Sequence, residues 1–85
     1  MGCFLYILKS KTADRYYIGI SDHPETRLLH HNTTEKGFTS RYRPWEMVFV
    51  KEYPTRVEAK TVEQRLKSMK SKTVISEFIH DKFHI

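Results

Sequence analysis

The sequence has a single cysteine, Cys3, and lacks any apolar run long enough to cross a membrane. One cysteine excludes an intrachain disulfide framework and is typical of proteins from a reducing compartment. The first apolar run, residues 3–8, is too short for a membrane span and has no basic flank of the kind that signal peptides carry. We therefore expect a cytoplasmic protein that does not associate with membranes.

Acidic residues are also fewer than basic ones. The chain has 10 Asp and Glu and 15 Lys and Arg, which give a formal net charge of +5. Such an excess is typical of proteins that bind polyanions, although a solvated basic surface explains the charge equally well. The chain has 85 residues, 39% of them apolar. This size predicts a single domain, residues 1–85, with one hydrophobic core rather than two.

Hydrophobic patterning and the positions of turn residues predict the order β-β-α-β-α-α and an α+β fold with a three-stranded antiparallel sheet. A polar, basic loop is expected over residues 33–44. Asn32 is a plausible end for the first helix. The strands are expected over residues 3–8, 15–20 and 45–53, and the helices from Pro24 to about His31, from Thr55 to residue 69 or 70, and after Ser71.

The first two strands are expected to form a hairpin around residues 10–13. Equidistant pairing then puts Tyr6 opposite Tyr17, and facing residues on paired strands point to the same side. Alternation turns the aliphatic residues of both strands toward the core and turns Tyr6, Tyr17 and Gly19 to the other face.

The tyrosines of the first two strands and the residues that follow them along the chain resemble the GIY-YIG nuclease domain, and the resemblance covers essentially the whole chain. The first motif is degenerate but keeps Tyr6, and the second is intact as Tyr17-Ile18-Gly19. Arg27 and His31 follow on a helix, four residues apart and hence on one face, and Glu63 lies within the apolar stripe of a later helix. The sequence is most similar to the small, single-domain bacterial members of the family.

The resemblance implies a metal-dependent endonuclease that hydrolyses DNA phosphodiester bonds, in DNA repair or recombination, with Mg or Mn as its cofactor. It implies no small-molecule cofactor, and DNA as the partner, branched or damaged. Tyr6 and Tyr17 correspond to the paired active-site tyrosines, Arg27 to the phosphate-binding arginine and His31 to an assisting group. Glu63 corresponds to the metal ligand, and Gly19 provides a hollow where the backbone approaches the site.

The residue types suit this chemistry. The planar guanidinium of Arg27 matches two phosphate oxygens, and Glu63 offers the hard oxygen that Mg or Mn prefers. Either tyrosine can position or activate a water. Contacts to DNA phosphates are expected from the basic residues of the loop and the last two helices, namely Arg41, Arg43, Lys60, Lys67, Lys70 and Lys72.

Each site residue also has a simpler interpretation: the tyrosines as packing residues, Arg27 as a solvated residue, and Glu63 as the partner of Lys60, Arg65 or Lys67. Two other functions therefore stay open. One is a catalytically weak nucleic-acid-binding module, since the late asparagine of many family nucleases has no counterpart here. The other is a protein-interaction domain with a basic face. The nuclease hypothesis requires Glu63 to lie beside Tyr6, Tyr17 and Arg27.

Overall fold

The computed structural model describes residues 2–33, 41–69 and 72–83, with side chains described up to Ile79 in the last helix. Its elements confirm the predicted order β-β-α-β-α-α. They are β1 (Cys3–Ser10), β2 (Tyr16–Ser21), α1 (Pro24–Thr33), β3 (Trp45–Tyr53), α3 (Arg56–Met69) and α4 (Lys72–Phe83). The predicted bounds of β3 and the predicted start of α4 are confirmed, and the bounds of β1, β2, α1 and α3 differ from the prediction by one or two residues.

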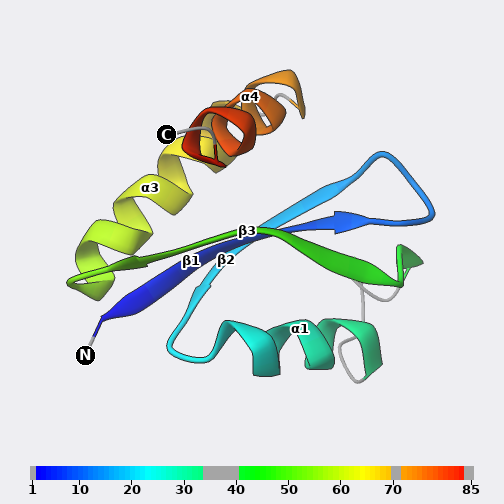
Figure 1. Cartoon of the computed structure of the whole chain (residues 1–85), viewed down its shortest axis with the longest axis horizontal. Helices are drawn as coiled ribbons and strands as arrows, with labels where there is room; N and C mark the ends of the chain where they lie inside the picture. Colours follow the sequence, from blue (N-terminus) through cyan, green and yellow to red (C-terminus); the bar gives the residue numbers. More distant parts are fainter. Residues whose placement is uncertain (1, 34–40, 70–71, 84–85) are drawn as a thin grey trace.

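The sheet has the strand order β2-β1-β3, and β1 pairs with both neighbours in the antiparallel sense. β1 is therefore central, and β2 and β3 are the edges. Helix α1 packs on one face of the sheet, whereas α3 and α4 cover the other (Figure 1). We call these the α1 face and the α3 face. No helix in the described part of the chain is long and apolar enough to cross a membrane.

The prediction of one core is wrong, because each face of the sheet has its own apolar cluster. A central strand covered on both sides needs apolar side chains at consecutive positions, and β1 has them from Leu5 to Leu8, all buried. The α3-face cluster contains Leu5, Ile7, Ile18, Phe49, Leu66 and Ile75. The α1-face cluster contains Tyr6, Leu8 and Trp45, with Tyr17, Leu28, Tyr42 and Met47 packed against them.

The predicted hairpin register is also wrong, because Tyr6 faces Gly19 and Tyr17 faces Leu8. The turn lies further along the chain than assumed. The Ser10 hydroxyl accepts hydrogen bonds from the backbone N–H groups of Thr12 and Ala13, both at 3.1 Å, and organises the turn there. Because the shift is two residues and a strand repeats every two residues, each side chain keeps its predicted face.

Local capping explains where the helices begin. The Ser21 hydroxyl accepts the backbone N–H of His23 at 2.9 Å, and Pro24 then opens α1. The Thr55 hydroxyl accepts the N–H of Glu58 at 3.2 Å, which caps α3.

Asn32 has a role that its sequence position did not predict, since α1 continues to Thr33. Its amide nitrogen donates to the Trp45 carbonyl at 3.1 Å, and its amide oxygen accepts the Trp45 N–H at 2.6 Å. Arg43 Nε also donates to the carbonyl of His31 at 2.8 Å. These bonds fasten the last turn of α1 to the start of β3 and so fix His31 above the sheet.

Candidate active site

Tyr6 lies at the centre of the predicted site. The side chain is 1% exposed, and its hydroxyl oxygen is 3.2 Å from His31 Nε2, with which it shares a hydrogen bond. His31 is itself 1% exposed. Arg27, one turn earlier on the same face of α1, also forms a side-chain hydrogen bond with Tyr6. Helix α1 therefore brings both of its predicted site residues to one hydroxyl group.

The electrostatic surroundings of Tyr6 include a residue from the other side of the sheet. Burial raises the pKa of Tyr6 above its ordinary value, the hydrogen bond and charge of Arg27 oppose this, and Tyr17 and the negative charge of Glu63 raise the pKa further. Arg27 and Glu63 therefore both act on the same hydroxyl, although they belong to helices on opposite faces. The raised pKa extends the pH range over which Tyr6 stays a neutral phenol to values above 10.0.

Tyr17 extends the site from Tyr6 toward the β2 edge. Its ring stacks on that of Tyr6, with 6.3 Å between centroids and 16° between planes, and lies 4.4 Å from the His31 ring. The edge of Trp45 supports it at 6.5 Å. Because Tyr17 is only half-buried, it is the more accessible of the two tyrosines.

Gly19 forms the floor beneath Tyr6. A Cβ at position 19 would lie 2.6 Å from the Tyr6 hydroxyl oxygen and 2.7 Å from Cζ, closer than real Cβ contacts allow. The predicted hollow is therefore filled by the Tyr6 ring rather than left open.

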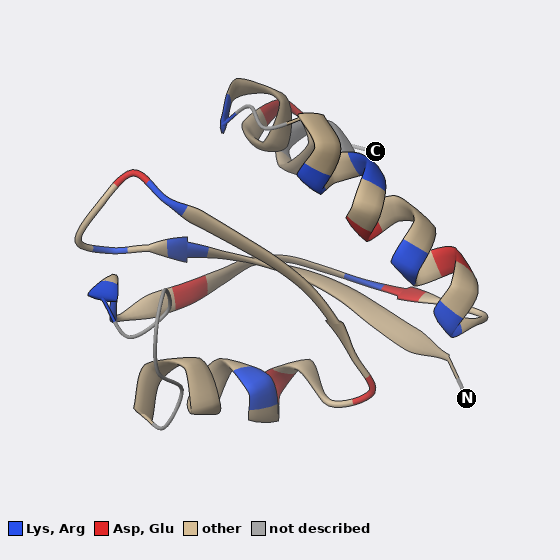
Figure 2. Ribbon diagram, turned by 180° about the vertical axis from the view of Figure 1, so that it is seen from behind, with Lys and Arg blue, Asp and Glu red and all other residues tan. Residues whose placement is uncertain are grey.

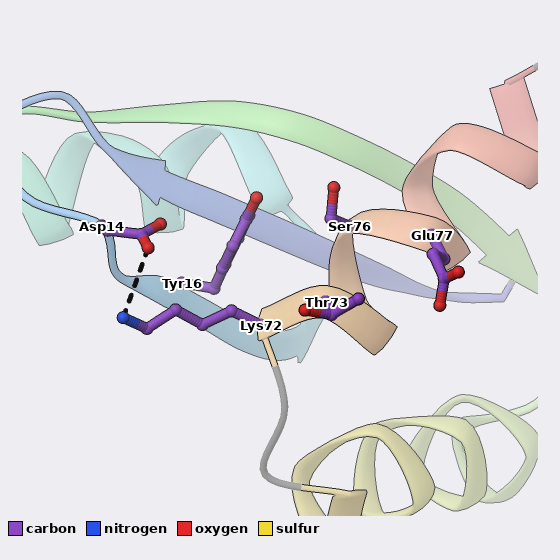
Figure 3. Close-up of a pocket in the computed structure, with 6 residues that line it drawn as sticks. All are labelled: Asp14, Tyr16, Lys72, Thr73, Ser76 and Glu77. Carbon is purple, nitrogen blue, oxygen red and sulfur yellow. Dashed lines mark hydrogen bonds and ion pairs between the residues drawn. The ribbon is translucent and has the colours of Figure 1, made fainter.

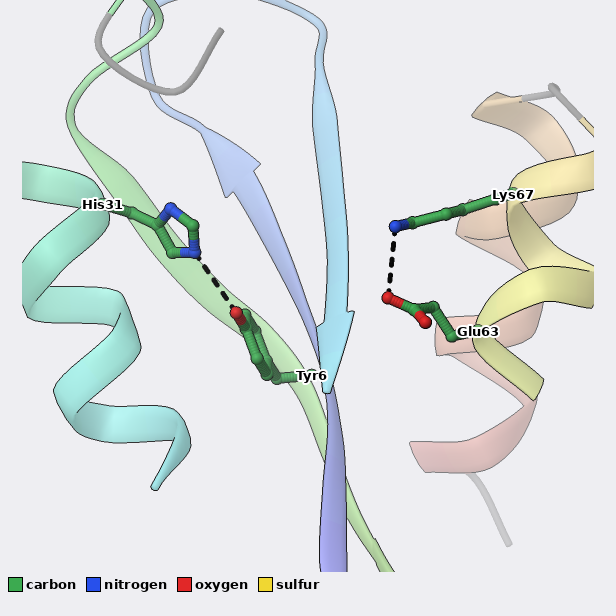
Figure 4. Close-up of polar contacts among 4 residues, drawn as sticks. All are labelled: Tyr6, His31, Glu63 and Lys67. Carbon is green, nitrogen blue, oxygen red and sulfur yellow. Dashed lines mark hydrogen bonds and ion pairs between the residues drawn. The ribbon is translucent and has the colours of Figure 1, made fainter. Parts of the chain in front are cut away.

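Glu63 and Lys67 reach the site from α3. Glu63 Oε2 is 3.1 Å from Lys67 Nζ, and the Glu63 side chain is 14% exposed. Lys67 is thus the partner of Glu63 among the three that the sequence left open, as their spacing of four residues on a helix favours. Lys67 Nζ also lies 6.0 Å from the centroid of the Tyr17 ring. Figure 4 shows the Tyr6–His31 and Glu63–Lys67 pairs on opposite sides of the sheet.

The donor set fits a hydrated divalent ion rather than a protein cage. In the described residues, no group of three or more His, Cys, Asp or Glu side chains converges as a metal cluster. Glu63 is a single hard oxygen ligand that already has a cation beside it. Such a carboxylate suits an ion that keeps several waters and takes further oxygens from a phosphate, as magnesium does.

The predicted DNA-contacting residues do not gather at one place. Lys60 and Lys67 are exposed on α3, where Figure 2 shows basic residues interspersed with acidic ones. Arg41 is exposed, whereas Arg43 is half-buried and bonded to the carbonyl of His31. Lys70 lies outside the described residues.

Lys72 forms a separate contact, away from the tyrosines. Its Nζ is 3.3 Å from Asp14 Oδ2 across an open pocket of about 290 Å³, which Tyr16, Thr73, Ser76 and Glu77 also line (Figure 3). Tyr16 belongs to the α3-face cluster, so this pocket and the Tyr6 site lie on opposite faces of the sheet.

The chain is similar to proteins of a known nuclease family. Residues 2–77 match the model of a family described as the GIY-YIG catalytic domain. Nucleases of this kind are phosphodiester hydrolases and generally use a divalent metal ion. The matched region contains every residue around Tyr6 described above.

Two curated fungal proteins are similar to part of the chain. One, structure-specific endonuclease subunit SLX1 of Phaeosphaeria nodorum, is 42% identical over 50 residues, which cover 53% of this chain and 14% of that protein. The other, structure-specific endonuclease subunit slx1 of Pyrenophora tritici-repentis, is 40% identical over 60 residues, which cover 64% of this chain and 16% of that protein. The chain thus spans only a small part of the length of these relatives.

Proposed function

We propose that this chain, which belongs to the GIY-YIG family of catalytic domains, is a metal-dependent endonuclease that hydrolyses DNA phosphodiester bonds. The observation that carries the proposal is the arrangement around the two stacked tyrosines. Arg27 and His31 of α1 bond the Tyr6 hydroxyl, and the Glu63–Lys67 pair of α3 lies beside the ring of Tyr17. A cation that binds the phosphate and a carboxylate that holds a metal ion are two of the groups that phosphodiester hydrolysis uses.

The proposed roles follow from burial and hydrogen bonding. Arg27 binds and orients the scissile phosphate with its planar guanidinium. Tyr6, neutral and held by His31, donates a hydrogen bond into the site. Tyr17, the more accessible tyrosine, orients the attacking water. Glu63 holds the divalent ion, Mg or Mn, which when bound stabilises charge on the phosphate and on the leaving alkoxide.

The proposed substrate is branched or damaged DNA, in repair or recombination. The support for branched DNA is the similarity to two proteins named as subunits of structure-specific endonucleases. DNA contacts by Arg41, Lys60, Lys67 and the other predicted basic residues are part of the proposal and would make binding sensitive to salt.

Two further predictions belong to the proposal. The first is membership of the small bacterial type of the family, which rests on the sequence resemblance alone. The second is a cytoplasmic location, which the single cysteine, free and buried, supports.

The test is cleavage of branched, single-stranded and plasmid DNA with Mg or Mn, comparing the wild type with Glu63→Gln and Tyr17→Phe. We expect Glu63→Gln to lower the cleavage rate by at least about a hundredfold, as loss of a group that stabilises transition-state charge does. Glu58→Gln, an exposed carboxylate on the same helix, is the matched control and should cut like the wild type.

The other outcomes separate the competing hypotheses. Equal cutting by the wild type, Glu63→Gln and Tyr17→Phe points to a contaminating nuclease. Salt-dependent DNA binding without any cutting favours a nucleic-acid-binding module. No binding even at low salt favours a protein-interaction domain with a basic face.

A further inference from the structure

Lys67 is the cation that lies beside Glu63 in the structure. Its Nζ is 3.1 Å from Glu63 Oε2, and the same nitrogen lies 6.0 Å from the centroid of the Tyr17 ring. We propose that Lys67 is a positioning residue that holds Glu63 in the metal-free protein and competes with the divalent ion for that carboxylate. This inference rests on the proposed function, because it takes Glu63 as the metal ligand.

The two members of the pair differ in their exposure, and this difference supports the inference. The Glu63 side chain is 14% exposed, whereas that of Lys67 is 53% exposed. A carboxylate largely removed from water needs a partner, while an exposed ammonium can return to solvent at little cost. Lys67 is therefore the member of the pair that can leave at little cost, which would free the Glu63 carboxylate for a metal ion.

The position of Glu63 distinguishes this pair from an ordinary ion pair on a helix surface. Most pairs spaced by four residues lie in solvent and contribute little. Here the carboxylate is close enough to the site to raise the pKa of Tyr6, and the ammonium lies near Tyr17. The contact therefore joins the carboxylate to the aromatic half of the site.

Competition follows from charge. An ammonium at 3.1 Å and a divalent ion both require the negative charge of Glu63, and they repel each other when both are close to it. The metal-free protein thus holds its carboxylate in place with Lys67, which reduces its affinity for the metal. Removing the ammonium while keeping the length of the side chain should tighten metal binding.

The experiment measures Mn²⁺ binding by the full chain without DNA, using the electron paramagnetic resonance signal of the free ion. Lys67→Met is expected to lower the Kd for Mn²⁺ roughly twofold to fivefold, within the range for losing a partly exposed ion pair. Lys67→Arg keeps the pair and should bind like the wild type. Lys60→Met removes the same charge one turn before Glu63 on α3. Lys60 forms no ion pair with Glu63, so this variant should leave the Kd unchanged.

Two results would overturn the inference: an unchanged or weaker Kd in Lys67→Met, or an equal tightening in Lys60→Met, which would mean that net charge alone acts. Glu63→Gln separates this failure from failure of the proposed function. If Glu63→Gln binds Mn²⁺ as the wild type does, Glu63 is not the ligand and both ideas fail. If it loses binding while Lys67→Met has no effect, only the role of Lys67 fails.

Discussion

Gly19 faces Tyr6 across the β1–β2 ladder, and the Tyr6 ring fills the space that a side chain at position 19 would need. A Cβ there would lie 2.6 Å from the Tyr6 hydroxyl oxygen. Tyr6 cannot swing aside easily, since it is fully buried and bonded to His31. The two residues are therefore matched in size, and the glycine is needed for space rather than for an unusual backbone conformation.

The first prediction concerns this match. Gly19→Ala should lower the free energy of unfolding by about 1–3 kcal/mol, the usual cost of overpacking, because the new methyl group displaces the Tyr6 ring. Urea denaturation measures the change. In a Tyr6→Leu background the clashing ring atoms are absent, so the same substitution should cost much less. An equal cost in both backgrounds would show that Tyr6 is not the obstacle.

The second prediction concerns alkaline pH. Burial raises the pKa of Tyr6 in the folded protein above the ordinary value of 10.0, so above that pH the unfolded chain loses this proton more readily than the native state. The stability that neutral Tyr6 contributes is therefore fully present below pH 10.0 and is lost as the pH rises through the folded pKa. Denaturation of the wild type should depend more steeply on pH in that range than denaturation of Tyr6→Phe.

A phenolate absorbance titration checks the pKa itself. Subtracting the titration curve of Tyr6→Phe from that of the wild type isolates Tyr6, and its midpoint should lie above 10.0. A midpoint at or below that value would mean that the charge and hydrogen bond of Arg27 outweigh burial, and Tyr6 would become a candidate base.

The third prediction concerns the attachment of α1 to β3. Asn32→Ala removes both side-chain bonds to Trp45 and leaves the Trp45 N–H without this acceptor, at a cost of about 1–3 kcal/mol. Thermal or urea unfolding measures the loss. Asn32→Asp keeps an oxygen that accepts the N–H and should retain part of the stability. If Asn32→Ala unfolds like the wild type, the contact is not needed to hold α1.

Much of the fold followed from local patterns. The Trp45–Tyr53 strand was predicted with its observed bounds, because an apolar, β-branched run is followed by Pro54. The faces of Tyr6 and Tyr17 were also predicted, since alternation depends only on a period of two. The register was not, because the hydroxyl of Ser10 decides where the turn lies through contacts that do not appear as periodicity.

The candidate site shows the same division. The sequence by itself determined the elements, the shared helix face of Arg27 and His31, and the i, i+4 spacing that lets Glu63 meet Lys67. Only the tertiary structure decided that α1 and α3 lie on opposite faces of one sheet and that the charges of Arg27 and Glu63 both act on Tyr6. The physical reason is that helical periodicity orients side chains around one axis, whereas the meeting of two helices across a sheet depends on packing both faces of β1.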